Sequence, residues 1–551
     1  MADWSPPGPG SWMRDADHAT QPSSRIHQDL FPKAMAAGFS QFTAEYGLPL
    51  SHLDVRYVNG WQFMRSRPAN TPERAVKAPP DAVLRWLLRL DPRARRREAQ
   101  AKRAFHAGLW AKDVDRWERV ERPRWTGRNL ALQTEALDEL DDSGLADHLR
   151  RASENFVEGI TLHFALLGPT MPVGELLVTG QDLGLAPTDL ARTLEGASPA
   201  SAAPVELLRR IAAGLAAAGA DPTDLDGVRS VSPEAAAALD DYLRLHGWRL
   251  LTHDDVFGQT LGEYPDLVLR SIRAVGVTRG SFGDGASVVA ELAGRLPEAD
   301  RDRFGRLVTD ARRAYATLDD QSGVLGCWTG GLLRRALLAS GARLHASGLL
   351  RRPDDVFHLS VAEVVALLQR KDGPSAGDVA DRAENWQRAA AADPPPWVGT
   401  PPSPPPDPAL FPPGMARAAR FFGAYLALKM GRPTPGPDLT GNGIGTGTYR
   451  GRARVALDPI AALTILEPGD VLVAVATTPA YNTVLPLLGA LVTEQGGLLS
   501  HPAVVAREFG IPAVVGVSGA TSHIRDGAMV EVDAAAGCVR MISDVSAGSP
   551  S

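Results

Sequence analysis

The segment that decides the fold runs from residue 490 to residue 516: ALVTEQGGLLSHPAVVAREFGIPAVVG. Apolar runs at its two ends, Ala490–Val492 and Ala513–Val515, predict two short strands. Pro502 suits the first position of a helix, where no backbone donor is needed. Gly510 suits the left-handed residue that ends a helix, and Pro512 prevents continuation. The segment therefore predicts a strand, a Gly-Gly turn, a short helix and a second strand.

His501 stands where the turn meets this predicted helix, with Ser500 or His501 itself at or beside the cap. Backbone N–H groups and the helix dipole favour an anion at such a place. Gly496 and Gly497 leave room for close approach, because they have no side chain. A neutral imidazole is a competent nucleophile near pH 7. The pattern predicts a histidine that carries a phosphoryl group; the alternative is a histidine that only caps the turn.

The whole segment resembles the phosphohistidine swivelling domain of PEP-utilising enzymes such as PEP synthase, pyruvate phosphate dikinase and rifampicin phosphotransferase. The shared pattern is Thr-Glu-x-Gly-Gly, then Ser-His, then Ala-Arg-Glu-x-Gly-Ile-Pro-Ala-Val-Val-Gly, with Pro502 in place of the usual Ala. The upstream Thr477-Thr478-Pro479 resembles the Thr-x-Pro turn of the family. The resemblance implies that His501 is catalytic. It also implies that neighbouring residues support its loop: Thr493, Glu494, Gly496, Gly497, Ser500 and Arg507.

Length and composition limit the classes of protein that fit. A chain of 551 residues is long enough for several domains, and 44% hydrophobic with 22% charged residues is typical of globular proteins. The net charge of −6 argues against nucleic-acid binding. The two cysteines form neither a disulfide framework nor a metal-ligand spacing, so we expect a reducing cytoplasm and no metal site. We find no uninterrupted apolar run that would span a bilayer and no apolar signal core, so we expect no membrane partner.

The first 390 residues show mainly helical periodicity. Residues 10–18 (GSWMRDADH) resemble the Trp-x-x-Asp-x-x-His entrance of the middle domain of rifampicin phosphotransferase-like proteins. Residues 246–265 resemble a Tyr-Gly-x-Arg stretch of the same family, followed by Asp and Glu-x-Pro. The matching positions imply a substrate-binding role for Arg249, Asp255 and Glu263. A structural network of arginine and carboxylates would explain the same residues.

A departure from the family lies at Leu318-Asp319-Asp320-Gln321-Ser322-Gly323, where phosphotransferases carry Arg-Glu with a nearby Lys. The carboxylates Asp319 and Asp320 remain, but the positive charges are lost. An acidic pair is able to deprotonate a substrate hydroxyl or to bind an amine or a metal. A capped helix start is the structural alternative. We therefore include Asp319 and Asp320 among the candidate substrate-binding residues.

The expected fold class is a multidomain α + α/β protein. Residues 1–390 form a large, mostly helical acceptor-binding domain, residues 391–435 a proline-rich linker with a connecting helix, and residues 436–545 a compact β/α phosphohistidine domain. In the last domain, short strands are expected at 471–475, 490–492, 513–515 and 529–532. The glycines of 431–436 and 441–447 are candidate hinges, because glycine tolerates large backbone changes.

The resemblance also implies a function. PEP synthases and rifampicin phosphotransferase begin with an ATP-grasp domain that charges the histidine, and we recognise neither that domain nor a PEP-binding barrel in this chain. The arrangement is similar to phenylphosphate synthase, whose histidine-bearing and ATP-grasp subunits are separate. We therefore expect no tightly bound cofactor. Phosphoryl groups would come from ATP and Mg²⁺ through a separate ATP-grasp partner and pass from His501 to a small-molecule hydroxyl, with dehydration as a further outcome. A non-catalytic binding or regulatory homologue and a carrier to another protein stay open.

Overall fold

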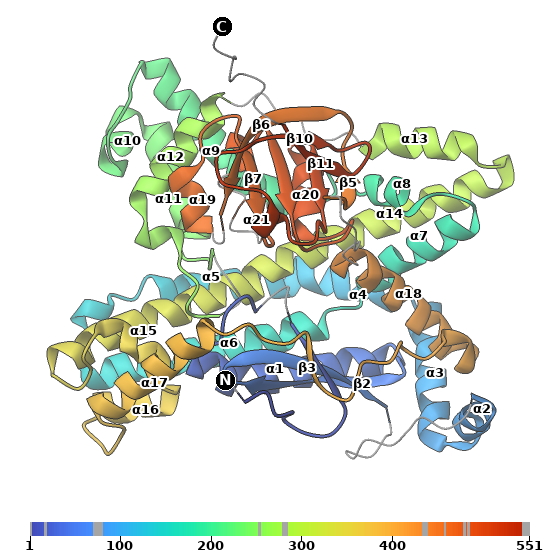
Figure 1. Cartoon of the computed structure of the whole chain (residues 1–551), viewed down its shortest axis with the longest axis horizontal. Helices are drawn as coiled ribbons and strands as arrows, with labels where there is room; N and C mark the ends of the chain where they lie inside the picture. Colours follow the sequence, from blue (N-terminus) through green and yellow to red (C-terminus); the bar gives the residue numbers. More distant parts are fainter. Residues whose placement is uncertain are drawn as a thin grey trace, which may run out of the picture. The chain divides into compact units, whose positions relative to one another are not determined.

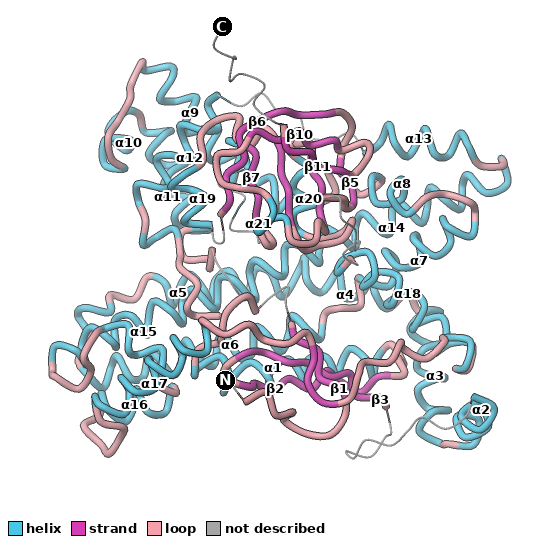
Figure 2. The backbone as a smooth tube through the Cα atoms, viewed as in Figure 1, coloured by secondary structure: helices cyan, strands magenta, loops and turns pink. Residues whose placement is uncertain are grey.

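The computed structural model describes residues 3–15, 19–69, 81–251, 255–277, 285–431, 439–456, 459–477, 481 and 485–542. The chain forms two compact units, each built from three separate stretches of sequence. Unit 1 comprises residues 1–171, 248–259 and 321–422, and unit 2 comprises residues 172–247, 260–320 and 423–551. Helices dominate both units and each also holds a sheet (Figures 1 and 2), so the expected α + α/β class is confirmed.

Unit 1 combines a helical core with a four-stranded sheet of order β2-β3-β1-β4. Its core centres on α6, which packs against α1 and α15 through buried residues such as Leu149, Phe156 and Leu337. The elements of unit 1 are β1 (Ser11–Arg14), α1 (Arg25–Glu45), β2 (Leu50–Val58), β3 (Trp61–Pro68), α2 (Asp81–Leu90), α3 (Pro92–His106), α4 (Leu109–Arg116), a π-helical turn (Trp117–Glu121), α5 (Arg122–Gln133), a 3-10 turn (Leu137–Glu139), α6 (Asp142–Ala165), a second π-helical turn (Ser322–Trp328), α15 (Thr329–Ala346), a 3-10 helix (Pro353–His358), α16 (Val361–Leu368), α17 (Ala376–Ala390), β4 (Trp397–Gly399), a 3-10 turn (Pro408–Leu410) and the first part of α18 (Pro413–Met430).

The strands of unit 1 were not expected from helical periodicity. β2 and β3 form an antiparallel hairpin whose turn is Asn59-Gly60, both with positive φ (51° and 79°). Such a turn matches the twist of the strands that it joins, which is why Asn-Gly is the common choice there. In the predicted linker, β4 pairs with β1 and so completes the sheet. This part of the proline-rich stretch is therefore a strand of unit 1.

Unit 2 holds a helical segment, residues 172–247 with 260–320, and a carrier segment, residues 439–542. Its helical elements are α7 (Thr170–Asp182), α8 (Pro187–Arg192), α9 (Pro199–Ala218), α10 (Leu225–Val231), α11 (Pro233–His246), a 3-10 turn (Leu261–Glu263), α12 (Pro265–Val277), α13 (Gly285–Arg295) and α14 (Glu298–Gln321). The elements of the carrier segment are β5 (Asn442–Ile444), β6 (Thr448–Val455), α19 (Pro459–Ile465), β7 (Val471–Ala474), a 3-10 turn (Leu485–Leu487), β8 (Ala490–Thr493), α20 (His501–Glu508), β9 (Ala513–Val515), α21 (Ala520–His523), β10 (Met529–Asp533) and β11 (Cys538–Met541).

The sheet of the carrier segment has seven strands in the order β11-β10-β6-β7-β8-β9-β5. β6, β7, β8 and β9 are parallel neighbours, and antiparallel strands flank them at both edges (orange and red in Figure 1). Every residue of β7, β8 and β9 is buried, which explains why their sequences are continuous apolar runs. The four strands expected from the sequence are confirmed as β7, β8, β9 and β10.

The contact-based units divide the chain differently from the predicted domains, because residues 172–247 and 260–320 group with the carrier segment. Of the candidate hinges, residues 432–438 lie outside the described residues. In the second glycine run, Gly443 lies within β5, where an added Cβ would be 1.9 Å from the carbonyl oxygen of Ala534. Gly445 and Gly447 have positive φ of 86° and 100°. The left-handed backbone that favours glycine in this run therefore lies after β5.

Candidate phosphohistidine site

The site lies where two neighbouring parallel strands end. Thr477 follows β7, and the turn after β8 leads to His501, the first residue of α20. The carboxyl ends of parallel strands form one edge of a sheet, and ligands in open α/β sheets bind at that edge. The hydroxyl oxygen of Thr477 lies 3.1 Å from Nδ1 of His501. The chain thus brings two polar groups together from two successive strand–helix turns.

His501 as a whole residue is partly exposed, but the Nε2 atom of its ring is buried and has no hydrogen-bond partner among the described residues. Burial lowers the pKa of His501 from its usual value to about 3, because the charged ring is poorly solvated there. The imidazole is therefore neutral at physiological pH. A neutral ring with one nitrogen held by Thr477 and the other unpartnered is suited to nucleophilic attack.

The start of α20 has an incomplete cap. Ser500 occupies the cap position with extended backbone (φ −70°, ψ 159°), but its side chain accepts no bond from the first turn. Its hydroxyl instead donates to the carbonyl oxygen of Gly497 at 2.7 Å. Pro502 follows as the sequence predicts. Because the Ser500 side chain leaves the first turn uncapped, the N–H groups at the positive end of the helix dipole favour an anion there.

The end of α20 explains why Gly510 is needed. Gly510 adopts φ 64°, its N–H donates to the carbonyl of Arg507, and the N–H of Ile511 donates to the carbonyl of Ala506. These two bonds form a Schellman motif, which requires a left-handed residue after the last helical turn. The helix is therefore fixed at both ends by the residues that the sequence singled out.

The Gly-Gly turn is tightly packed. A Cβ on Gly497 would lie 2.2 Å from the carbonyl oxygen of Leu428 in α18, and a Cβ on Gly496 would lie 2.5 Å from the hydroxyl of Ser500. Gly496 also has φ 112°, a conformation that other residues rarely adopt. Backbone bonds from Gly497 to Lys429 and from Leu499 to Leu428 tie the turn to α18. Both glycines are thus required by space or by backbone conformation.

The other predicted support residues have defined contacts. The hydroxyl of Thr493 donates to the carbonyl of Gln495 at 2.8 Å, and the carboxylate of Glu494 accepts from the N–H of Thr521 at 2.7 Å. Arg507 is buried, and its Nη1 donates to the carbonyl of Leu498 at 2.5 Å. Burial lowers the pKa of Arg507 to about 10, so it stays charged at neutral pH. These contacts shape the loop from residue 494 to residue 500, and Thr477 joins them as a residue that the motif alone did not assign.

The candidate substrate-binding residues are divided between the two units. In unit 1, the guanidinium of Arg249 lies over the ring of Trp328, with 5.4 Å from Cζ to the centroid. The carboxylate of Asp255 accepts from the N–H groups of Ser24 (2.7 Å) and Phe257 (3.1 Å). Asp255 therefore fixes the start of α1 to its own loop. This geometry matches the structural alternative, while substrate contact stays a prediction.

In unit 2, Glu263 closes a capping box by accepting from the N–H and the hydroxyl of Thr260. Asp319, near the end of α14, accepts from the hydroxyl of Ser198. Asp320 is its half-buried neighbour on the same helix. Glu263 and Asp319 thus have partners that order local backbone. Residues 16–18, 252–254 and 478–479, which belong to the other resemblances, lie outside the described residues.

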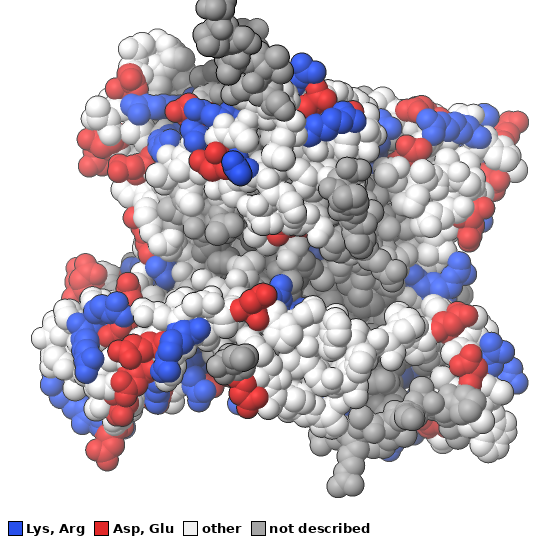
Figure 3. Space-filling view, viewed as in Figure 1, with Lys and Arg blue, Asp and Glu red and all other residues white. Residues whose placement is uncertain are grey.

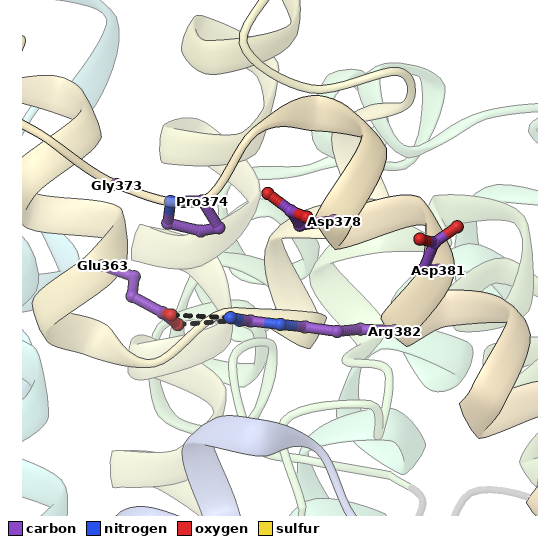
Figure 4. A pocket seen from close by; sticks show the side chains of 6 residues that line it. All are labelled: Glu363, Gly373, Pro374, Asp378, Asp381 and Arg382. Carbon is purple, nitrogen blue, oxygen red and sulfur yellow. Dashed lines mark hydrogen bonds and ion pairs between the residues drawn. The ribbon is translucent and has the colours of Figure 1, made fainter.

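A surface hollow elsewhere is a weaker candidate. It lies between α16 and α17 of unit 1 and is lined by Glu363, Gly373, Pro374, Asp378, Asp381 and Arg382 (Figure 4). Glu363 caps α16 and is paired with Arg382, and Asp378 caps α17. The Glu363–Arg382 pair thus joins the two helices, and Asp378 orders the start of its own helix. Among the described residues, no group of three or more His, Cys, Asp or Glu side chains is arranged to hold a metal ion.

The surface charge and the most apolar helical stretch also bear on the class of protein. On the face drawn in Figure 3, acidic and basic side chains are interspersed, in agreement with the modest net charge. One helical stretch of the described residues, 142–182, is long and apolar enough to cross a membrane. However, 61% of its most apolar window is buried inside the protein, as in the core helix of many proteins without a span.

The part of the chain that matches a known protein family contains Thr477 and His501. Residues 466–537 match the family described as PEP-utilising enzyme, mobile domain. The chain is 27% identical over 582 aligned residues to chondramide synthase from Chondromyces crocatus (96% of this chain, 14% of the relative). It is 32% identical to rifampicin phosphotransferase from Streptomyces sviceus, over 56% of this chain and 35% of the relative. It is 45% identical over 93 residues to phosphoenolpyruvate synthase from Aeropyrum pernix, which is 17% of this chain and 11% of the relative.

The chain spans about a third or less of the length of each of these three relatives. The matched family segment contains Thr477, the Gly-Gly turn, His501 and Arg507, which are the residues that build the site. Residues 466–537 thus match the mobile domain of the PEP-utilising enzymes, and parts of the chain are similar to a rifampicin phosphotransferase and a phosphoenolpyruvate synthase.

Proposed function

We propose that this chain is a phosphotransferase component that carries a phosphoryl group on His501. The observation that supports this most strongly is the difference between the two ring nitrogens. Nδ1 lies 3.1 Å from the Thr477 hydroxyl oxygen, whereas Nε2 has no hydrogen-bond partner among the described residues. When Nδ1 carries the ring hydrogen, it donates to Thr477 and leaves the lone pair on Nε2. In this tautomer the Thr477 hydroxyl accepts the ring hydrogen bond and Nε2 is the nucleophile.

The cycle consists of two displacements at phosphorus. Nε2 forms a bond to the phosphorus of the donor while the P–O bond of the leaving group breaks. The hydroxyl oxygen of the acceptor then attacks the same phosphorus, the N–P bond breaks, and the hydroxyl proton passes to a base. Splitting one transfer into two steps is covalent catalysis. The uncapped N-terminus of α20 offers favourable electrostatics for the phosphoryl group between the steps.

We propose a separate ATP-grasp protein as the source of the phosphoryl group, with Mg²⁺ and ATP as its substrates. The acceptor is a hydroxyl of a small organic molecule. One relative is named as a phosphotransferase of rifampicin, a small organic molecule, which favours this class of acceptor. A phosphorylated hydroxyl is a better leaving group, so the same transfer prepares the acceptor for dehydration. We place this chemistry in the cytoplasm, where ATP is available.

The test uses the purified chain, radiolabelled Mg-ATP and a purified ATP-grasp protein of the PEP synthase type. We expect label on the wild-type chain only when the ATP-grasp protein is present, and none on a His501→Asn variant. Calorimetry with ATP alone should show no micromolar binding to the isolated chain. Tight ATP binding by the isolated chain would contradict the separate-donor proposal. Label that persists in His501→Asn would contradict the phosphohistidine.

A non-catalytic binding or regulatory role is the second candidate, and the loss of basic residues at Asp319-Asp320 favours it. The same labelling experiment separates the two, because a protein without the chemistry takes up no label. A carrier that serves another protein would take up label but pass it to a protein rather than to a small molecule.

A further inference from the structure

Arg507 contacts a part of unit 2 that lies outside the matched family segment. Its Nε lies 4.0 Å from Oε1 of Glu195, which belongs to the turn between α8 and α9. The side chains of Arg507 and Glu195 are only 4% and 13% exposed. The same guanidinium donates through Nη1 to the carbonyl of Leu498. Arg507 therefore connects the helical segment to the loop that carries His501.

The turn that presents Glu195 is itself firmly held by α14. Nη1 of Arg312 donates to the carbonyl oxygens of Thr193 (2.6 Å) and Glu195 (2.7 Å). Asp319, two helical turns further along α14, accepts from the hydroxyl of Ser198. Because both ends of the turn are bonded to one helix, Glu195 is presented in a fixed position. This gives Asp319 a definite role in ordering the turn, separate from its predicted contact with substrate.

Arg507 and Glu195 each favour the charged form of the other side chain. Burial raises the pKa of Glu195, and the nearby cations Arg507, Arg192 and Arg312 oppose this effect. Burial lowers the pKa of Arg507 to about 10, while Tyr315 and Glu195 oppose that change and Arg192 adds to it. At neutral pH, a charged Arg507 thus sits in a poorly solvated place with Glu195 as its nearby carboxylate. Removing one partner of a buried pair leaves the other charge uncompensated.

A second contact joins the same two segments. Arg270 of α12 donates through Nη1 to the carbonyl of Thr464 (3.2 Å) and through Nη2 to that of Leu466 (3.5 Å), at the end of α19. Cations interact favourably with carbonyl groups at a helix C-terminus. Arg507 and Arg270 thus join the two segments at separate places among the described residues, and of these two contacts the one made by Arg507 leads to the His501 loop.

We propose that Glu195 is a positioning residue for the phosphohistidine loop, acting through Arg507 and Leu498, and that this ion pair breaks whenever the carrier segment leaves the helical segment. The proposal rests on the proposed function of His501 and extends it to a residue that no motif marks. It assigns to the helical segment a part in ordering the nucleophile, in addition to any contact with the acceptor.

Hydrogen exchange tests the connection without any ligand. In Glu195→Gln, the amides of Gly497 and Leu499, which are bonded to α18, should exchange at least about threefold faster than in the wild type. Glu206→Gln, an exposed glutamate on α9 of the same segment, is the matched control and should leave them unchanged. A purely local role of Glu195 would speed exchange in residues 193–198 only, and that result would overturn the proposal.

If Glu195→Gln does not fold, Glu195→Asp replaces it. The aspartate keeps the charge but withdraws it by one methylene group, so a smaller increase in exchange at the same two amides is expected. No increase in the folded aspartate variant would overturn the proposal in the same way.

A second readout uses potassium phosphoramidate as a small chemical phosphoryl donor. Because Nε2 is buried, loosening the loop should raise the rate of phosphorylation of His501 at least about threefold in Glu195→Gln, and not in Glu206→Gln. An unchanged or lower rate would count against the role of Glu195. A wild-type chain that takes no phosphate on His501 would contradict the proposed function instead, and the exchange result would still decide the role of Glu195.

Discussion

The hydroxyl oxygen of Thr477 lies 3.1 Å from Nδ1 of His501, although 24 residues separate them in the sequence. The contact is possible because β7 and β8 are parallel neighbours, so the turns that follow them meet at one edge of the sheet. In our account this bond fixes the ring and leaves Nε2 as the nucleophile.

Replacing Thr477 with Val should slow phosphorylation of His501 about fivefold to tenfold. The change removes one hydrogen bond to the ring, worth about 1 kcal/mol, at nearly constant volume. Thr477→Ser keeps the hydroxyl and should retain most of the wild-type rate. The rates are measured with phosphoramidate under single-turnover conditions. Equal rates for Val and Thr would show that the bond does not prepare the ring.

The pH dependence follows from the pKa of His501, which burial lowers to about 3. The folded ring stays neutral down to acidic pH, so the rate of phosphorylation should not fall between pH 8 and pH 5. The unfolded chain, with an imidazole pKa near 6.5, binds a proton that the folded ring does not. This contribution to the free energy of unfolding is therefore complete above about pH 6.5 and lost as the pH falls towards 3.

Thermal unfolding of the wild type and of His501→Asn across pH 4 to 8 measures the second part of that prediction. The wild type should lose more stability than the variant on acidification, because only the wild type has this ring to protonate on unfolding. A rate of phosphorylation that halves near pH 6.5 would instead indicate an exposed imidazole with an ordinary pKa.

Gly497→Ala should destabilise the protein by about 1–3 kcal/mol, as overpacking commonly does, and should displace the His501 loop. The added Cβ would lie 2.2 Å from the carbonyl oxygen of Leu428, which cannot move without disturbing α18. Gly423→Ala on the same helix is the control, since nothing lies within 4 Å of its added Cβ. Circular dichroism melts compare the three proteins. A Gly497→Ala variant as stable as the control would show that the turn is loosely packed.

The proposed cycle requires the carrier segment to move between two partners, because one histidine serves both a donor protein and an acceptor. A short bis-maleimide link between Arg270→Cys and Thr464→Cys, in a Cys538→Ser background, should hold the carrier segment on the helical segment. We expect the linked chain to lose charging by the ATP-grasp protein. A chain that is charged first and linked afterwards should still lose its phosphate to acceptors in cell extract.

The same double-cysteine chain without the linker is the control for this experiment, and Cys327 is buried. Normal charging of the linked chain, at the rate of the unlinked one, would show that this contact need not open during the cycle.

The carrier segment could be predicted in detail because its residues are neighbours in the sequence. The apolar runs marked β7, β8, β9 and β10, and Pro502 and Gly510 marked the two ends of α20. Each of these features depends on local backbone chemistry, which a sequence expresses directly. The position of Thr477 beside His501 required the strand order as well, which only the structure supplies.

Other features could not be obtained in this way. Asn59-Gly60 between alternating runs is a hairpin signal that helical periodicity obscured, and with it the sheet of unit 1. Glu195 carries no motif at all, and its contact with Arg507 joins positions more than 300 residues apart in the chain. The grouping of residues 172–247 with the carrier segment is likewise a property of packing.

The central claim is that His501 carries the phosphoryl group, and the most direct measurement is the position of the phosphate. The purified chain is incubated with Mg-ATP and an extract of the cells in which the protein naturally occurs. It is then re-isolated under alkaline conditions, and the phosphate is mapped by mass spectrometry. The His501→Asn variant is treated in parallel. The account predicts one phosphate on His501 that is lost in acid and kept in base, and none in the variant. A stable phosphate on another residue, or a wild-type chain that stays unmodified while the ATP-grasp protein in the extract is active, would contradict it.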